Sequence, residues 1–166
     1  MSSFANLAQV LRDEVKHYNG ILSITEEMQK ALVANNFEEL NSALKKQQLS
    51  IVASGKLEEE RSQVLANLGT ELGLSAKDIT LSMVIEVAPQ EKREEFIELQ
   101  KQLTDKVDKI KTVSSQNEVL IKDSLSYIDY AMKMFTAIEE KKTYDRGSEQ
   151  DANKRQSVNR VFDKRV

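Results

Sequence analysis

Apolar residues recur at intervals of three and four along most of this 166-residue chain, and that spacing restricts the fold more than any other feature. The pattern is clearest between residues 89 and 142, where large apolar residues fall within a narrow helical arc at about 100° per residue. They are Phe96, Leu99, Leu103, Val107, Ile110, Ile121, Leu125, Ile128, Met132 and Phe135. Such a stripe packs against one or two other helices, as in a coiled coil. Because no sustained two-residue alternation is found, the sequence predicts an all-α protein.

Two long helices are predicted in the first half of the chain. The first extends from Ser3 to about Val33. The second follows Asn36, which can cap it, with Glu39 three residues later as a capping-box partner. Gly69 and Gly73 indicate its end, because glycine readily adopts the left-handed conformation that terminates helices.

A short helix and then the longest one are predicted in the second half. Ser75 is the expected cap of the short helix, which ends at Ala88 because the residue before a proline is pushed out of helical geometry. Pro89 suits the first turn of the next helix, which we expect to extend to about Lys142. The expected fold is a set of long antiparallel helices forming an elongated coiled-coil-like bundle, with one short extra helix and a mobile C-terminal tail.

Two polar residues, Ser114 and Asn117, interrupt the stripe of the longest helix. An Asn in such a seam commonly fixes the register of the packed helices at some cost in stability. We expect this structural role here.

A second apolar row begins beside the stripe at residue 120. Its members are Leu120, Tyr127, Ala131, Met134 and Ile138. With this row the apolar face widens to roughly half of the helix circumference. The row either packs on the short helix or binds a partner protein, and periodicity alone leaves both open.

The last 24 residues, 143–166, break the pattern. Tyr144 to Ser148 indicate a helix stop, and the remainder contains few apolar side chains. A segment of this composition cannot bury enough apolar surface to fold alone. We therefore predict a helical bundle domain over residues 1–142 and a flexible tail over residues 143–166.

Composition argues against catalysis and against a metal or cofactor. The chain contains no cysteine, which excludes disulfides, thiolate catalysis and cysteine-type zinc sites. Glu14 and His17 match the Glu-x-x-His motif of di-iron bundles, but that site needs two copies and His17 is the only histidine. The scattered glycines form no phosphate-binding loop. A metal-dependent bundle enzyme is thus the least favoured hypothesis, and we expect no enzymatic activity.

The charge and hydropathy pattern indicates a cytoplasmic protein. The formal net charge is -3, and the tail carries only a thin excess of basic residues, so nucleic acid is not an expected partner. The N-terminus lacks the basic start and apolar core of a secretory signal. No apolar run approaches the ~20 residues that a membrane-spanning helix needs, and we expect no stable membrane insertion.

Several motifs together resemble the FlgN family of flagellar export chaperones over almost the whole chain. They are Phe37-Glu38-Glu39-Leu40, then Lys56-Leu57-Glu58-Glu59-Glu60-Arg61 before Leu68-Gly69, Asn117-x-x-Leu120-Ile121, and Thr143-Tyr144-Asp145-Arg146-Gly147. In one departure, Ser114 stands where the family pattern has the first residue of Asn-x-x-Asn.

The resemblance implies a chaperone of flagellar type III secretion. Such chaperones bind the hook-filament junction proteins FlgK and FlgL near their C-termini, keep them unassembled and deliver them to the export gate protein FlhA. The family's partner-binding surface lies in its C-terminal helical part, which agrees with the widened face at residues 120–138. The family's Tyr-x-x-Gly tyrosine, which contacts FlhA, corresponds to Tyr144. The alternative is a structural, self-associating coiled-coil adaptor without chaperone activity.

Overall fold

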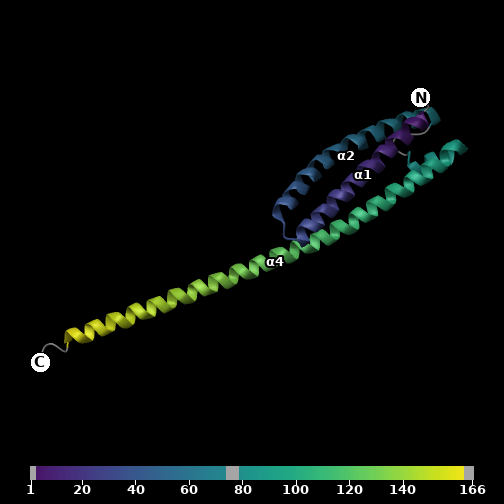
Figure 1. The fold of residues 1–166 in the computed structure, drawn as a ribbon. Helices are drawn as coiled ribbons and strands as arrows, with labels where there is room; N and C mark the ends of the chain where they lie inside the picture. Colours follow the sequence, from purple (N-terminus) through teal and green to yellow (C-terminus); the bar gives the residue numbers. More distant parts are fainter. Residues whose placement is uncertain (1–2, 74–78, 163–166) are drawn as a thin grey trace. The chain divides into compact units, whose positions relative to one another are not determined.

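The computed structural model describes residues 3–73 and 79–162, with side chains described as far as residue 139. Within these ranges it contains four helices and no strand (Figure 1). They are α1 (Ser3–Val33), α2 (Phe37–Leu72), α3 (Leu81–Val87) and α4 (Gln90–Phe162). The all-α prediction is confirmed. The chain divides into an N-terminal unit, residues 1–120, and a C-terminal unit, residues 121–166.

The ends of α1 and α2 lie where the sequence predicts them. The Asn36 side chain caps α2 by accepting a hydrogen bond from the backbone N–H of Glu39, at 3.2 Å. At the other end Gly73 has a left-handed backbone, with φ 69°, and its N–H reaches the carbonyl oxygens of Gly69 and Thr70. Here the local capping rules were sufficient.

Helix α3 is shorter than predicted. It begins at Leu81, after Thr80, whose hydroxyl accepts a hydrogen bond from the N–H of Met83 at 3.3 Å. Ser75, the expected cap, lies outside the described residues. Threonine is also a preferred N-cap residue, so the sequence contained two candidates and the nearer one caps α3. The predicted end is confirmed, because Ala88 has extended backbone geometry.

Helix α4 extends beyond its predicted end. Its assignment reaches Phe162, so the expected end near Lys142 is wrong. One internal glycine costs only about 1 kcal/mol relative to alanine, and the sole proline of the chain is Pro89. Gly147 therefore does not stop this helix. The division into a bundle domain over residues 1–142 and a flexible tail over residues 143–166 stays a prediction.

Helices α1 and α2 of the N-terminal unit run antiparallel (Figure 1). Glu27, late in α1, forms an ion pair with Lys46, early in α2, at 2.7 Å. Glu14, early in α1, pairs with Arg61, late in α2, at 3.4 Å. The reversal follows from the short connection between the two helices.

Helices α1 and α4 run parallel, as expected when each long helix reverses the direction of the one before. Arg12 of α1 forms an ion pair with Glu95 near the start of α4. Further along both helices, Asn117 of α4 donates a hydrogen bond to the carbonyl oxygen of Thr25. These contacts fix how the two helices align within the N-terminal unit.

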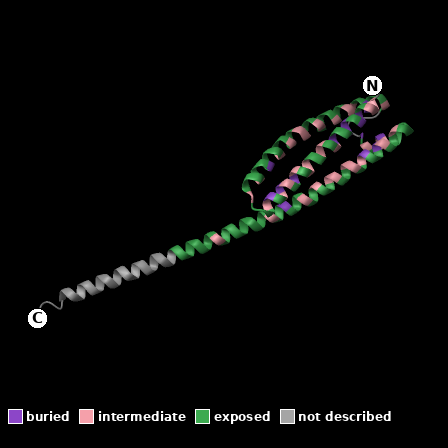
Figure 2. Ribbon diagram, viewed as in Figure 1, coloured by how far each residue is buried: buried purple, intermediate pink, exposed green. Residues whose placement is uncertain are grey.

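The core of the N-terminal unit gathers near the start of α1 and the start of α4. Its buried members are Leu7, Ala8, Leu11, Leu68, Ile79, Val84, Ala88, Phe96 and Leu99. Buried and half-buried positions lie along the facing sides of the helices (Figure 2). The first half of the predicted α4 stripe thus packs as expected, because Phe96 and Leu99 are core residues.

Candidate protein-binding surface

Exposed apolar side chains are concentrated on α4 between residues 121 and 139. The large ones are Ile121, Leu125, Tyr127, Ile128, Tyr130, Met132, Met134, Phe135 and Ile138. Figure 2 shows this segment as almost continuously exposed. Contiguous exposed apolar surface of this kind is typical of a site that binds another protein.

The second row predicted from the sequence is largely exposed. Tyr127, Met134 and Ile138 are 73%, 49% and 47% exposed, whereas Leu120 and Ala131 are half-buried. Val84 of α3 belongs to the core of the N-terminal unit.

The later part of the main stripe is also exposed, which the sequence interpretation missed. Ile121, Leu125, Ile128, Met132 and Phe135 were expected to pack in the seam, and all five are exposed. The physical reason is helix length. A helix of 31 residues can cover only a similar length of its partner, and α4 is 73 residues long. The predicted lengths, 3–33 against 89–142, already contained this signal.

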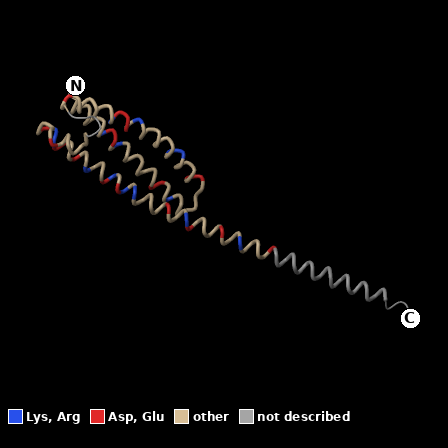
Figure 3. Tube along the Cα trace, turned by 180° about the vertical axis from the view of Figure 1, so that it is seen from behind, with Lys and Arg blue, Asp and Glu red and all other residues tan. Residues whose placement is uncertain are grey.

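We call the two rows together the distal face. It consists of Leu120, Ile121, Leu125, Tyr127, Ile128, Ala131, Met132, Met134, Phe135 and Ile138. At about 100° per residue it covers roughly half of the helix circumference. The ion pair between Asp129 and Lys133, 2.7 Å long, lies outside this arc. Charges of both signs are interspersed along the described helices (Figure 3).

The contact between α1 and α4 contains a buried polar side chain. Asn117 is only 4% exposed, and its Nδ2 donates to the Thr25 carbonyl oxygen at 3.0 Å. Next to it, Gln29 and Gln116 are joined by a side-chain hydrogen bond of 2.8 Å. Ser114 is exposed and takes no part in this seam.

Both residues of the Glu-x-x-His motif in α1 interact with side chains of α2. The Glu14 carboxylate is buried, and its pKa is raised by that burial, an effect that the charge of Arg61 partly offsets. The Nε2 atom of His17 lies 2.8 Å from the hydroxyl of Ser54. In the described part of the chain no group of three or more potential metal ligands comes together. The motif therefore has a structural explanation in the α1–α2 contact.

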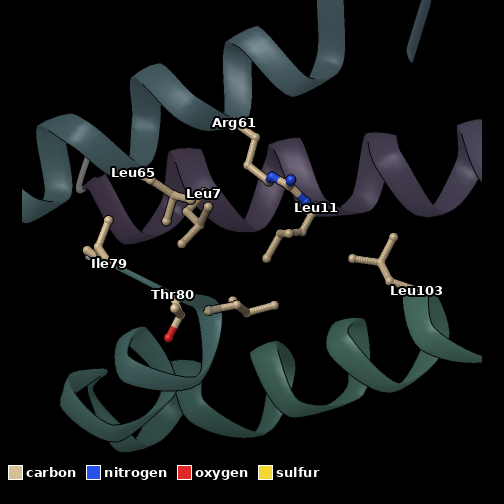
Figure 4. Close-up of a pocket in the computed structure, with 8 residues that line it drawn as sticks. Leu7, Leu11, Arg61, Leu65, Ile79, Thr80 and Leu103 are labelled. Carbon is tan, nitrogen blue, oxygen red and sulfur yellow. The ribbon is translucent and has the colours of Figure 1, made fainter. Parts of the chain in front are cut away.

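One cavity of about 250 Å³ lies within the N-terminal unit (Figure 4). Its lining residues are Leu7, Leu11, Arg61, Leu65, Ile79, Thr80, Leu81 and Leu103. The two polar residues of the lining already have partners, since Arg61 binds Glu58 and Glu14, and Thr80 caps α3. We assign this cavity to core packing.

The predicted gate-docking residue, Tyr144, lies beyond residue 139, the last residue whose side chain is described. The backbone of Tyr144 belongs to α4, but its side chain is outside the described residues, so its proposed docking role stays a prediction.

Over the part of the chain that the structure describes, none of the helices combines the length and the apolarity that crossing a membrane requires.

Comparison with known proteins gives both a matching family and a similar bacterial protein. A family model described as FlgN protein matches residues 1–152. A protein of Bacillus subtilis (strain 168) with the name Uncharacterized protein YvyG is 27% identical over 166 residues, which is 100% of both chains. No solved structure matches the chain.

Proposed function

Because this chain belongs to the FlgN family of flagellar export chaperones, we propose that it is a cytoplasmic chaperone for the hook-filament junction subunits FlgK and FlgL. It binds these subunits near their C-termini, keeps them from assembling early and delivers them to the export gate protein FlhA. The observation that carries this proposal is the exposed apolar distal face of α4.

The distal face fits an amphipathic helix laid along α4. Such a helix buries its apolar side against a complementary surface through residues spaced three and four apart. Met132 and Met134 contribute flexible, polarisable side chains that adapt to more than one sequence. This adaptability suits a chaperone with two different client subunits.

Release of the client must also be possible. A face about five helical turns long, carried by one helix, offers a limited contact area. Interfaces of limited area form reversible complexes more readily than the large apolar interfaces of obligate dimers. The client can therefore leave when the export gate engages the complex.

Delivery to the gate is assigned to the region beyond the distal face. Tyr144 is the proposed contact with FlhA, since a tyrosine combines a large apolar ring with a hydroxyl and is enriched at interface hot spots. Its position after Ile138 separates it from the client-binding residues along the sequence. Client and gate could then be held by one chain at the same time.

The decisive experiment measures binding of C-terminal fragments of FlgK and FlgL to the full-length chain by isothermal titration calorimetry. A chaperone gives saturable binding of one fragment per chain, with a negative heat-capacity change from apolar burial. The alternative, a structural coiled-coil adaptor, predicts no binding of either fragment. Failure of both fragments to bind would therefore remove the proposed function.

A further inference from the structure

The middle of helix α2 carries a second exposed apolar surface, which the proposed function does not use. Its large side chains, Leu44, Leu49, Ile51 and Val52, are 40%, 74%, 65% and 62% exposed. At about 100° per residue they spread over about 160°, a little under half of the helix circumference. Exposed apolar surface of this extent is typical of a contact site.

This surface lies on the side of α2 that faces away from α1. Ala43, which is buried, and Ser54, which bonds His17 of α1, mark the packed side of the same segment. On the angular estimate the exposed sector is centred nearly opposite these two residues. The apolar side chains are therefore free of the packing between α1 and α2.

The charges of this segment are all positive. Between residues 40 and 57 α2 contains three lysines and no carboxylate (Figure 3). Lys46 forms an ion pair with Glu27 of α1 at 2.7 Å. Lys45 and Lys56 are exposed and fall within the apolar sector, beside Val52 and Leu49 on the same angular estimate. A partner of this surface should therefore carry negative charge.

We call these residues the basic apolar surface. It consists of Leu44, Lys45, Leu49, Ile51, Val52 and Lys56. Its width distinguishes between two kinds of anionic partner. A single partner helix covers a narrow stripe, as in a coiled coil, whereas this sector is broad and has lysines among its apolar residues. A lipid surface is broad, and at its boundary lysine stems lie along the apolar region while the ammonium groups reach the phosphates.

We propose that the basic apolar surface binds reversibly to a membrane that contains anionic lipids. The apolar side chains of α2 enter the boundary between headgroups and acyl chains, and Lys45 and Lys56 pair with lipid phosphates. Only one side of α2 takes part, because the other side packs on α1. The contact is thus peripheral, and it would concentrate the chain at a membrane surface independently of any client.

Flotation of the full-length chain with vesicles tests the role of charge. The vesicles are made of phosphatidylcholine mixed with phosphatidylglycerol, and phosphatidylcholine alone provides the comparison. We expect binding to the mixed vesicles that weakens as salt is added, because salt screens the attraction between lysine and lipid. Lys45→Glu combined with Lys56→Glu should lower the affinity at least about tenfold, whereas arginine at both positions should retain it.

A second pair of variants tests the apolar contribution. Leu49→Asp combined with Val52→Asp should lower vesicle affinity at least about tenfold, because apolar burial is lost and negative charge is added. Both side chains are exposed, so helicity should be unchanged in circular dichroism. The matched control is Met134→Asp combined with Ile138→Asp, which makes the same change of charge on the distal face and should retain vesicle binding.

Several results would overturn the proposal. They are no binding to the mixed vesicles, equal binding to phosphatidylcholine alone, unchanged binding by the Lys45 and Lys56 glutamate variant or by the Leu49 and Val52 variant, and loss of binding in the distal-face control. An acidic amphipathic peptide that binds this surface while the mixed vesicles do not would assign it to a protein partner instead. The vesicle assay contains no client, so its outcome is separate from that of the FlgK and FlgL titrations.

Discussion

Asn117 of α4 donates its side-chain amide to the carbonyl oxygen of Thr25 of α1, at 3.0 Å, across the contact between the two helices. The donor is satisfied, but Oδ1 of the same buried side chain has no hydrogen-bond partner among the residues that the structure describes. A buried acceptor left unpaired costs roughly 1–3 kcal/mol. The unpaired acceptor of Asn117 therefore destabilises the contact between α1 and α4. Polar residues that fix the register of packed helices commonly carry such a cost in stability.

The first prediction is that Asn117→Leu stabilises the protein. The carbonyl of Thr25 lies inside α1 and keeps its helical N–H partner, so the substitution removes the unpaired acceptor and adds apolar packing. We expect the free energy of unfolding to rise by about 1 kcal/mol in urea denaturation. Asn117→Asp is the opposing variant and should destabilise by more than this. A loss of stability in Asn117→Leu would contradict the argument.

A second prediction concerns the buried carboxylate of Glu14. Burial raises its pKa in the folded state above the ordinary value of 4.5, and Arg61 offsets part of this effect. The folded state thus takes up a proton more readily than the unfolded state, so stability is gained as pH falls through the raised pKa towards 4.5. In Glu14→Gln the side chain no longer titrates.

We therefore expect the difference in unfolding free energy, wild type minus Glu14→Gln, to increase as pH falls from 7 towards 4.5 and to level off below that value. Urea denaturation of both proteins at several pH values measures it. A difference that decreases over this window would mean that the ion pair with Arg61 outweighs the burial of Glu14.

A third prediction follows from the turn between α3 and α4. The Arg93 guanidinium donates to the carbonyl oxygens of Ile85, at 3.1 Å, and of Glu86, at 2.9 Å, near the C-terminal end of α3. Arg93→Ala should lower the free energy of unfolding by about 1–2 kcal/mol, because these terminal carbonyls lose a charged donor. Arg93→Lys should recover only part, since an ammonium group lacks the two-pronged geometry. Equal stability of all three proteins would sink the idea.

Most of the fold could be predicted from the sequence, because the signals that mark helix ends and buried helix faces are local. Asn36, Gly73 and Pro89 mark helix ends by their own conformational preferences, and the apolar period identifies the buried side of α4 at Phe96. The extension of α4 past Lys142 was missed, because a single Gly147 was given too much weight. Exposure at Leu125 was missed because the apolar period was interpreted without comparing the predicted lengths of the helices, 3–33 against 89–142.

The fourth prediction tests the client site directly. Met134→Asp combined with Ile138→Asp should abolish binding of the FlgK and FlgL fragments, because two charges would be buried in an apolar contact. Both side chains are exposed, so far-ultraviolet circular dichroism should be unchanged. The matched control is Tyr130→Asp, an exposed position of α4 outside the distal face, which should retain binding. Retained binding in the double variant would place the client elsewhere.

The last prediction assigns Tyr144 to the export gate and not to folding. Tyr144 is six residues beyond Ile138, the last residue of the distal face, and beyond the core of the N-terminal unit in sequence. Tyr144→Ala should therefore leave the Tm and the client affinity nearly unchanged while binding to FlhA and subunit secretion both fall. Tyr144→Phe separates the ring from the hydroxyl and should retain most of the gate binding if ring contact dominates. If Tyr144→Ala instead lowers the free energy of unfolding by more than about 1–2 kcal/mol, the range expected for lost aromatic packing, the side chain serves the fold by packing back on α4. Thermal denaturation, client titration and gate binding on the same preparation decide between the two roles.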